Sequence, residues 1–417
     1  MQGKIVNKIV VLQIPNSKNN GSAMMAINSI NYFDSNVKGD VEFLCDFSSS
    51  EDENRIVSEL NEGTKVSTLE LPTFDRGSNL LSSLMNRIKW INDVIRIIKA
   101  HKPLSIIVLG GDDFSEYYSG SKIIVRLFFM NRLSQYFPVY LIGHTIGPFT
   151  SWRKKAFETL MAKCRIITRD EPSLKHLESD LKHRHSSQGH DLAWFNLPKQ
   201  TVELKSRMLQ KFNLEDGKYV VITPSGLVSH YTDVDADFLN AWDDIAKLIT
   251  AKGLKVVFMP HVFKNNQRDD RTVIEEISTL IGKKDNIVFI NDMHLPSECR
   301  AILSGCYFSI ACRMHAAVST LQTDKPTIAL SYSAKYAGVI GGDMQCPELV
   351  IEAADSNLWS RGILEEVDNK VSFIEENYSL LCEKISSRVA TIQVEQDGIL
   401  KQCSIQMTEK NGAPFAN

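Results

Sequence analysis

Short apolar runs rich in β-branched residues alternate along this chain with longer segments in which apolar residues recur at helical spacing. Six such runs lie at residues 9–14, 41–47, 65–71, 104–110, 139–145 and 165–170, and five more lie at 219–225, 255–261, 286–292, 307–313 and 326–332. Strands that alternate with helices pair in parallel, because each helix carries the chain back along the sheet. The pattern predicts an α/β protein with two mostly parallel sheets.

A polar interval near residues 196–217 separates the two sets of runs. A chain of 417 residues also exceeds the size at which one hydrophobic core keeps growing. We therefore predict an N-terminal α/β domain over 1–195, a C-terminal α/β domain over 196–355, and helices with a polar tail over 356–417. Two Rossmann-like domains that face each other would bind ligands outside the carboxyl ends of their strands.

Composition narrows the classes of partner. The 47 basic and 50 acidic residues give a net charge of −3, which excludes an overall field that attracts nucleic acid. The eight cysteines form no CxxC pair, so we expect reduced thiols, no metal site and a cytoplasmic protein. No window approaches the roughly 18 apolar residues of a spanning helix, although peripheral contact with the inner face of a membrane stays open.

Basic residues follow two apolar runs of the second domain. If 307–311 and 326–330 are neighbouring parallel strands joined by a helix near 316–323, the three cations Arg313, His315 and Lys335 emerge at one sheet edge. The start of that helix attracts anions. The cluster predicts a phosphate or carboxylate site, and the alternative is that Arg313 pairs with a carboxylate while His315 packs inside.

Other polar residues at predicted strand ends extend this list. Hydroxyl groups come from Ser331, Tyr332 and Ser333 in the same loop, and His261 follows another strand of the second domain. In the first domain Arg169 ends a strand, with an Arg169–Asp170 structural pair as the alternative. His261 in a solvated loop is an equal alternative, and Asp191 either lines the crevice or caps the domain.

Three glycine-bearing loops follow strands of the first domain. They are "PNSKNNGSAMMAI", "LGGDDFSEYY" and "IGHTIGPF". Glycines permit close approach of a ligand, and neighbouring polar side chains can bind sugar hydroxyls. We call the residues that could bind a sugar in this way the acceptor candidates. They are Gly110, Gly111, Asp112, Asp113, Glu116, Tyr117, His144 and Asn20. The two glycines can also be simple turn residues. None of the loops matches the GxGxxG or P-loop pattern, so the sequence gives no support to NAD or ATP.

In this order the motifs resemble the polysaccharide pyruvyl transferase family. They are "NNGSAMMA", "LGGDDFSEYY", "IGHTIGPF", "ITRDEPSLKHL", "GHDLAWF" and "CRMHAAVSTLQTDKPTIALSYSAKYAGVI". The resemblance covers residues from about 16 to 342. It implies a fold similar to the GT-B glycosyltransferases and transfer of a pyruvyl group from phosphoenolpyruvate to a sugar as a cyclic ketal. The acceptor would be a nucleotide sugar, a lipid-linked sugar or a polymeric glycan, with no further cofactor.

That reaction assigns roles to the candidate residues. Phosphoenolpyruvate carries a carboxylate and a phosphate, so its binding calls for two separate cationic sites. Arg169, Arg313 and Lys335 are the candidates for these sites. His315 is the candidate acid that protonates the enol carbon, because histidine is the side-chain type most often used for proton transfer. Ser331, Tyr332, Ser333 and His261 are then expected to bind the donor. A glycosyltransferase that uses a nucleotide sugar and a non-catalytic binding protein are the rival interpretations.

Overall fold

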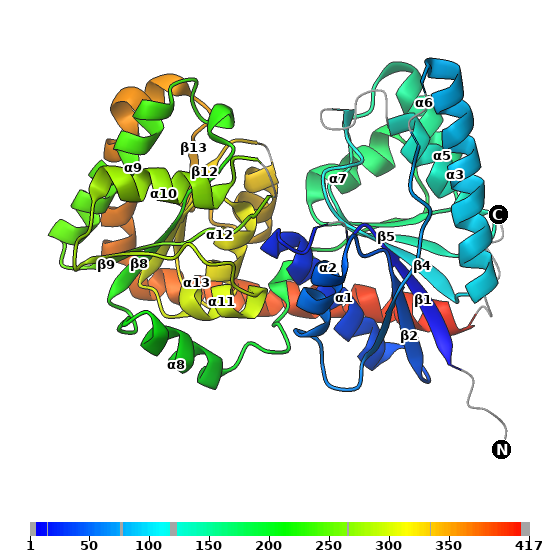
Figure 1. The fold of residues 1–417 in the computed structure, drawn as a ribbon, viewed down its shortest axis with the longest axis horizontal. Helices are drawn as coiled ribbons and strands as arrows, with labels where there is room; N and C mark the ends of the chain where they lie inside the picture. Colours follow the sequence, from blue (N-terminus) through cyan, green and yellow to red (C-terminus); the bar gives the residue numbers. More distant parts are fainter. Residues whose placement is uncertain are drawn as a thin grey trace. The chain divides into compact units, whose positions relative to one another are not determined.

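The computed structural model describes residues 6–14, 16–75, 78–116, 123–264, 267–333 and 335–409. They form two compact units, each built around its own sheet. The first unit comprises Met1–Asn16, Ser29–Asp191 and Glu395–Asn417, and the second comprises Ser17–Asn28 and Leu192–Val394. Figure 1 shows that helices flank the sheet in each unit, which confirms the predicted two-domain α/β class.

The first unit contains a parallel sheet of seven strands in the order β3-β2-β1-β4-β5-β6-β7. The order reverses direction at β1 and β4, which is the topological switch point of a doubly wound sheet. The strands are β1 (Asn7–Leu12), β2 (Val41–Cys45), β3 (Lys65–Thr68), β4 (Ser105–Leu109), β5 (Val139–His144), β6 (Arg165–Thr168) and β7 (Ser186–Gln188).

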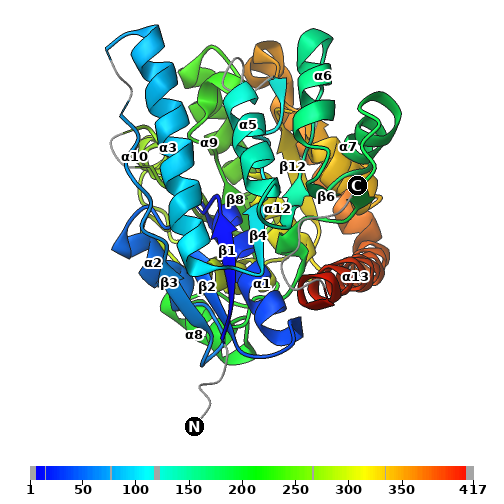
Figure 2. The same cartoon turned by 90° about the vertical axis from the view of Figure 1, so that its right-hand side faces the viewer.

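Helices α3, α5 and α6 lie side by side on one face of this sheet (Figure 2). The helices of the unit, apart from those shared with the second unit, are α2 (Ser50–Val57), α3 (Leu80–His101), α5 (Ile123–Ser134), α6 (Ser151–Leu160), α7 (Glu171–Lys175) and the short η2 (His176–Asp180). Asn79 caps α3 in a reciprocal capping box with Ser82. Its apolar residues at helical spacing then pack on the sheet, which explains why this segment folds as a helix.

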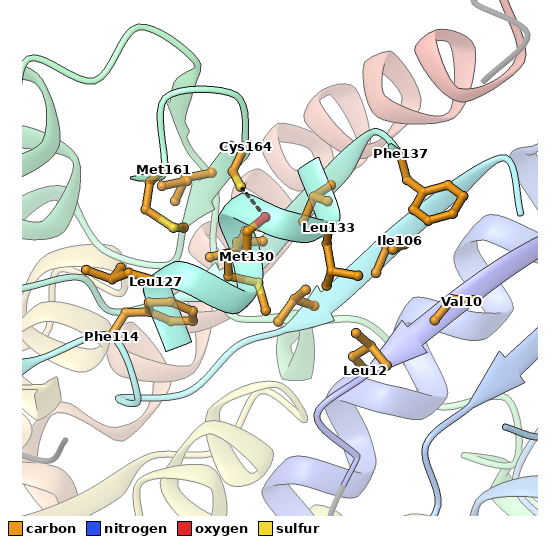
Figure 3. Close-up of a cluster of buried hydrophobic side chains, with 14 of the residues drawn as sticks. Val10, Leu12, Ile106, Phe114, Leu127, Met130, Leu133, Phe137, Met161 and Cys164 are labelled. Carbon is orange, nitrogen blue, oxygen red and sulfur yellow. Dashed lines mark hydrogen bonds between the residues drawn. The ribbon is translucent and has the colours of Figure 1, made fainter. Parts of the chain in front are cut away.

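Buried side chains of these three helices and of the strands form one core. Phe114, Leu127, Met130 and Met161 pack together over the strand residues Val10 and Ile106, which come from β1 and β4 (Figure 3). Burial of a large apolar side chain stabilises a protein by about 1.5–3 kcal/mol. This layer therefore fixes the strands whose carboxyl ends carry the candidate residues.

The second unit contains a parallel sheet of six strands in the order β10-β9-β8-β11-β12-β13. The strands are β8 (Tyr219–Thr223), β9 (Lys255–Phe258), β10 (Ile287–Phe289), β11 (Phe308–Ala311), β12 (Thr327–Ser331) and β13 (Val350–Glu352). Strands β11 and β12 are parallel neighbours joined through α12 (Met314–Leu321), as the sequence predicted.

The remaining helices of the second unit connect these strands or cover them. They are α8 (Val202–Lys211), α9 (Asp235–Ala251), α10 (Asp270–Ile281), α11 (Pro296–Ser304) and the short η3 (Leu192–Trp194), η4 (Val228–His230), η5 (Ala337–Asp343), η6 (Pro347–Leu349) and η7 (Leu358–Gly362). Asp269 caps α10 by accepting the backbone N–H groups of Arg271 and Thr272. The position of Asp270, the first residue of α10, is important for the site below.

Two helices contribute residues to both units. Helix α1 (Asn20–Asn36) begins in the second unit and ends in the first, whereas α13 (Ile363–Glu409) begins in the second unit and passes to the first at residue 395. Asn377 interrupts the helical geometry of α13. The sequence placed residues 17–28 in the first domain and 356–417 in a separate segment, so the observed units differ there.

Every apolar run predicted as a strand contains one. The sequence did not indicate the edge strands β7 and β13, because each has only three residues. Within the described ranges, no helix combines the length and apolar character needed to cross a bilayer. The predicted polar tail after residue 409 and Tyr117 fall outside the described residues.

Candidate active site

Arg313 lies at the carboxyl end of β11, as the N-cap residue of α12, and forms a bidentate ion pair with Asp270. Its Nε is 3.1 and 3.2 Å from the two carboxylate oxygens, and its Nη2 is 2.5 Å from Oδ1. The remaining nitrogen, Nη1, has no hydrogen-bond partner among the described residues, and the side chain is 11% exposed. Burial alone lowers the pKa of Arg313, but the Asp270 carboxylate outweighs it and raises the pKa.

The Asp270 carboxylate is fully buried and also accepts three backbone N–H groups. Gly226 N lies 2.8 Å from Oδ1, and His261 N and Val262 N lie 3.1 and 2.8 Å from Oδ2. These donors come from the loops that follow β8 and β9. Asp270 therefore holds two loops and the Arg313 guanidinium in one arrangement, and sequence reasoning missed it.

His261 lies two residues beyond the end of the β9 run and is 1% exposed. Neither of its ring nitrogens has a hydrogen-bond partner within the part of the chain that the structure describes. Burial, followed by the charges of His315 and Arg313, lowers the pKa of His261 well below its usual range. The ring is therefore neutral at neutral pH. Because an unpaired buried polar group costs about 1–3 kcal/mol, these nitrogens mark a position suited to a ligand.

His315, the second residue of α12, packs directly against Gly21 of the "NNG" motif. A Cβ atom on Gly21 would lie 2.1 Å from the His315 Nδ1 atom, so residue 21 has no room for a side chain. Asn20, which the sequence placed on the acceptor side of the first domain, lies in the second unit instead. Its backbone N–H donates to the carbonyl of His261, and its side chain donates to the Cys299 thiol.

Tyr332 and Lys335 join the same sheet edge after β12. The Lys335 ammonium donates to the Tyr332 hydroxyl at 3.0 Å and lies 5.0 Å from the centre of its ring. The buried Ser331 hydroxyl is directed to Ser333 O and to the Glu352 carboxylate, both at 3.1 Å, which leaves it no proton for a ligand. The Ser333 hydroxyl is buried and has no partner among the described residues.

Two buried tyrosines fix the backbone beside Arg313. The hydroxyls of Tyr231 and Tyr336 donate to the carbonyl oxygen of Cys312 at 2.7 and 2.6 Å. Burial raises the pKa of both tyrosines well above their usual range, so the hydroxyls keep their protons and remain donors. We call the set Arg313, His261, His315, Tyr332 and Lys335 the Arg313 cluster.

Arg169 occupies the corresponding edge of the first unit, where all three of its guanidinium nitrogens bond to protein oxygens. Nε donates to Thr145 Oγ1 at 2.8 Å, Nη1 donates to the buried Asp191 at 3.3 Å, and Nη2 pairs with Asp112. Burial alone lowers the pKa of Arg169, but Asp112 and the other carboxylates raise it. The structure thus pairs Arg169 chiefly with Asp112 and Asp191, and Asp191 lies inside the unit.

The structural partner of Asp170 is not Arg169. Asp170 caps α7 by accepting the Ser173 N–H at 2.9 Å, and it accepts the Thr145 hydroxyl at 2.7 Å. Thr145 therefore links Arg169 to Asp170. We call Arg169, Asp112, Thr145, Asp170 and Asp191 the Arg169 cluster.

The glycine loop after β4 has mixed roles. A Cβ atom on Gly110 would lie 1.9 Å from Gly143 O, so Gly110 is required for close packing of β4 on β5. Gly111 has more room, since the nearest atom would be 3.9 Å away on Asp113. His144 is buried, its Nε2 donates to Val108 O at 3.2 Å, and burial lowers its pKa to about 4. It is a neutral interior residue in this structure.

The remaining acceptor candidates pair with arginines of neighbouring helices. Asp113 lies 2.9 Å from Arg126 of α5, and Glu116 lies 3.7 Å from Arg153 of α6. Glu116 also accepts the N–H of Thr150, the N-cap residue of α6, at 2.6 Å. The Asp113 side chain is 45% exposed and that of Glu116 is 16% exposed, so Asp113 is more accessible to an acceptor.

Comparison with solved structures identifies proteins with a similar fold. UDP-GlcNAc 2-epimerase of Neisseria meningitidis, solved with UDP-GlcNAc, matches with a TM-score of 0.63 over 96% of this chain and 100% of that chain, at 11% identity. A glycosyltransferase of Rickettsia africae matches with a TM-score of 0.58 over 97% and 99% of the two chains, at 12% identity. At these identities the similarity supports the GT-B-like fold alone.

Sequence comparison identifies a curated relative and a matching family model. The amylovoran biosynthesis protein AmsJ of Erwinia amylovora is 24% identical over 273 residues, a match that spans 63% of this chain and 63% of that relative. The family model described as polysaccharide pyruvyl transferase matches residues 19–334, a range that includes the Arg169 cluster and all of the Arg313 cluster except Lys335, which follows it directly. The chain therefore belongs to the polysaccharide pyruvyl transferase family.

Proposed function

We propose that this chain transfers the pyruvyl group of phosphoenolpyruvate to two hydroxyls of a sugar, forming a cyclic ketal and releasing phosphate. Its family supports pyruvyl transfer in polysaccharide synthesis, and the name of AmsJ associates that relative with amylovoran biosynthesis. The identity of the donor and the ketal chemistry are what the resemblance to this family implies, and the Arg313 cluster supports an anionic donor.

The observation that carries the proposal is the unused hydrogen-bonding capacity of this cluster. Arg313 retains Nη1, and His261 retains both ring nitrogens, while Asp270 fixes the Arg313 guanidinium and the backbone beside His261. Donors held in place in this way suit a carboxylate or phosphate, because they need no reorganisation when the anion binds. Lys335 supplies a second positive charge at the same edge.

We assign different roles to the two histidines. His261 is neutral, because burial and neighbouring cations disfavour its protonation, so it serves as a hydrogen-bond partner of the bound donor. His315 begins α12 and is only partly buried, and we assign it to protonation of the enol carbon. Gly21 holds the His315 ring by direct contact and thereby limits its orientation.

The proposed reaction balances in two steps. Protonation of the methylene carbon makes the neighbouring carbon electrophilic, and one sugar hydroxyl adds to it. The second hydroxyl then displaces phosphate from that carbon and closes the ring. The two sugar hydroxyls release two protons in total. One proton returns to His315 and replaces the proton that it gave to the methyl group, and the other leaves with the phosphate.

The acceptor remains assigned to the first unit. We propose that Asp113 contacts acceptor hydroxyls, because it is the most exposed carboxylate of its loop. Arg169 would bind an anion only by exchanging one of its present bonds. Asp112, whose side chain is 18% exposed, is the partner most open to such exchange. In the observed state, Arg169 acts as a positioning residue for Asp112 and Thr145.

A phosphate-release assay with candidate acceptors tests the reaction. Phosphate release that requires both phosphoenolpyruvate and a sugar diol, together with a product carrying a new ketal methyl resonance, would support it. Transfer of a sugar from a UDP-sugar without phosphoenolpyruvate would instead establish the glycosyltransferase alternative. Binding of phosphoenolpyruvate without turnover on any acceptor would favour the non-catalytic alternative.

A further inference from the structure

Exposed apolar side chains gather on the three helices α3, α5 and α6 of the first unit. Leu84, Met85 and Ile88 of α3 are 52, 63 and 45% exposed, Phe128 of α5 is 37% exposed, and Trp152 of α6 is 56% exposed. Leu84 and Ile88 are four residues apart, and Met85 lies beside Leu84, so the three residues share one helix face. Five of the thirteen exposed large hydrophobic residues in the described chain thus occur on three adjacent helices.

Most of these residues lie toward one edge of the sheet. Helices α3, α5 and α6 are crossovers between parallel strands, so each begins at the carboxyl edge, where the Arg169 cluster also lies. Leu84, Met85 and Ile88 are in the first half of α3, and Trp152 is the second residue of α6. Figure 2 shows that the three helices lie side by side.

Basic residues accompany the apolar ones. The three helices contain only two carboxylates, Asp93 and Glu158, against nine cations: Arg87, Lys89, Arg96, Lys99, Arg126, Arg132, Arg153, Lys154 and Lys155. This excess contrasts with the chain as a whole, whose net charge is −3. Arg126 and Arg153 pair with Asp113 and Glu116, which connects the surface to the proposed acceptor loop.

We infer that this surface, defined by Leu84, Met85, Ile88, Phe128 and Trp152 with the surrounding cations, docks on an anionic lipid bilayer. Aliphatic and tryptophan side chains insert at the level of the headgroups, while lysine and arginine contact lipid phosphates. The local excess of cations over carboxylates matches the negative surface of an anionic bilayer, and a protein partner is an outcome that the measurements below distinguish. The inference depends only on this surface and is independent of the reaction proposed above.

Vesicle co-sedimentation tests the inference with the full chain. We expect the protein to bind vesicles of phosphatidylglycerol and phosphatidylcholine, and to bind pure phosphatidylcholine much more weakly. The variant Met85→Ser/Ile88→Ser should bind the anionic vesicles about tenfold more weakly, since it removes two inserted side chains. The control variant Val202→Ser/Val394→Ser changes residues that are 74 and 73% exposed elsewhere, and it should bind like the wild type.

Charge and insertion have separate readouts. Lys154→Glu and Lys155→Glu should each weaken binding to anionic vesicles by about fivefold or more. The chain has five tryptophans, and Trp152 is the one that belongs to the exposed large hydrophobic residues of the described chain. Lipids with brominated acyl chains should therefore quench its fluorescence, and Trp152→Phe should remove that quenching. Thermal unfolding of each variant checks that the fold is retained.

Three results would overturn the inference. The first is failure of the folded wild type to bind anionic vesicles. The second is binding that the serine and glutamate variants leave unchanged, or Trp152 fluorescence that brominated lipids do not quench. The third is a concentration-dependent dimer that Met85→Ser/Ile88→Ser dissociates, without vesicle binding, which would identify a second copy of the chain as the partner.

Discussion

The Asp270 carboxylate binds the Arg313 guanidinium through two of its three nitrogens and leaves the third, Nη1, at the partly open edge of the sheet. In the first unit Arg169 uses all three nitrogens for protein contacts. The two arginines therefore differ in what they can offer a ligand. This contrast is why we place the donor at Arg313 and treat Arg169 as a positioning residue in the observed state.

The substitution Asp270→Asn should destabilise the fold and weaken binding of phosphoenolpyruvate. It leaves the Arg313 charge without its buried partner, which typically costs about 3–5 kcal/mol. Asp269→Asn is the matched control, because asparagine can also cap the adjacent helix start and the variant loses only the ion pair with the partly exposed Arg271, which should cost about 1 kcal/mol or less. Urea unfolding followed by circular dichroism measures both. Equal destabilisation by the two variants would contradict the role assigned to Asp270.

Gly21→Ala should lower turnover while the sheets remain folded. The new methyl group would overlap the His315 ring, so the ring or the start of α1 must move. A displacement of the catalytic acid by about 1 Å can cost about a hundredfold in rate. Gly398→Ala in α13 meets no atom within 4 Å and should stabilise the protein by about 0.5–1 kcal/mol without affecting turnover. Wild-type turnover in Gly21→Ala would show that this contact does not orient His315.

His315→Ala should reduce kcat by about a hundredfold or more and leave the affinity for phosphoenolpyruvate nearly unchanged. The physical reason is that a proton donor acts on the transition state, whereas Arg313 and His261 bind the ground state. Steady-state kinetics combined with calorimetry separates the two effects. Nearly full turnover in this variant would remove His315 from the mechanism.

Stability should fall on acidification partly because of His261. Its pKa is depressed in the folded state, so below pH about 6.5 the unfolded chain binds a proton that the folded chain does not bind. Full stability is therefore present above the ordinary pKa and is lost as the pH falls below it. Between pH 7.5 and 5.5 this linkage amounts to about 1.4 kcal/mol.

Urea unfolding at these two pH values tests the assignment through the variant His261→Gln. The loss of unfolding free energy between pH 7.5 and 5.5 should be smaller in the variant than in the wild type by about 1.4 kcal/mol. His144, whose pKa is lowered to about 4, remains in both proteins and contributes equally. An unchanged loss in His261→Gln would mean that His261 is protonated in the folded protein.

The periodic pattern of the sequence was sufficient for most of the fold. Each apolar run contains a strand, and most of these strands are buried, although the edge strand β3 is not. The parallel pairing of β11 with β12 brought Arg313, His315 and Lys335 to one edge as expected. The three-residue strands β7 and β13 carry no such signal, because they are too short to form a recognisable run and are stabilised by pairing at the sheet edge. The exchange of residues 17–28 into the second unit was also unpredictable, since nothing local marks where a helix changes its packing partner.

The site was predictable as far as it depends on strand ends. Asp270 was missed because it stands in the polar segment "NNQRDDR", where a carboxylate before a helix indicates only a cap. Its role arises from three loops that the topology brings together. Glu116 and His144, predicted to bind the acceptor, and Ser331, predicted to bind the donor, look free in the sequence but bond to neighbouring groups in the fold.

Calorimetric titration of phosphoenolpyruvate tests the central claim most directly. We expect saturable binding to the wild type, binding about tenfold to a hundredfold weaker in Arg313→Ala, and an intermediate loss in Arg313→Lys, which keeps the charge and the pair with Asp270. Arg271→Ala removes a nearby, more exposed arginine and should bind normally. Equal affinity of phosphoenolpyruvate for the wild type and for both Arg313 variants would contradict the assignment of the donor to the Arg313 cluster.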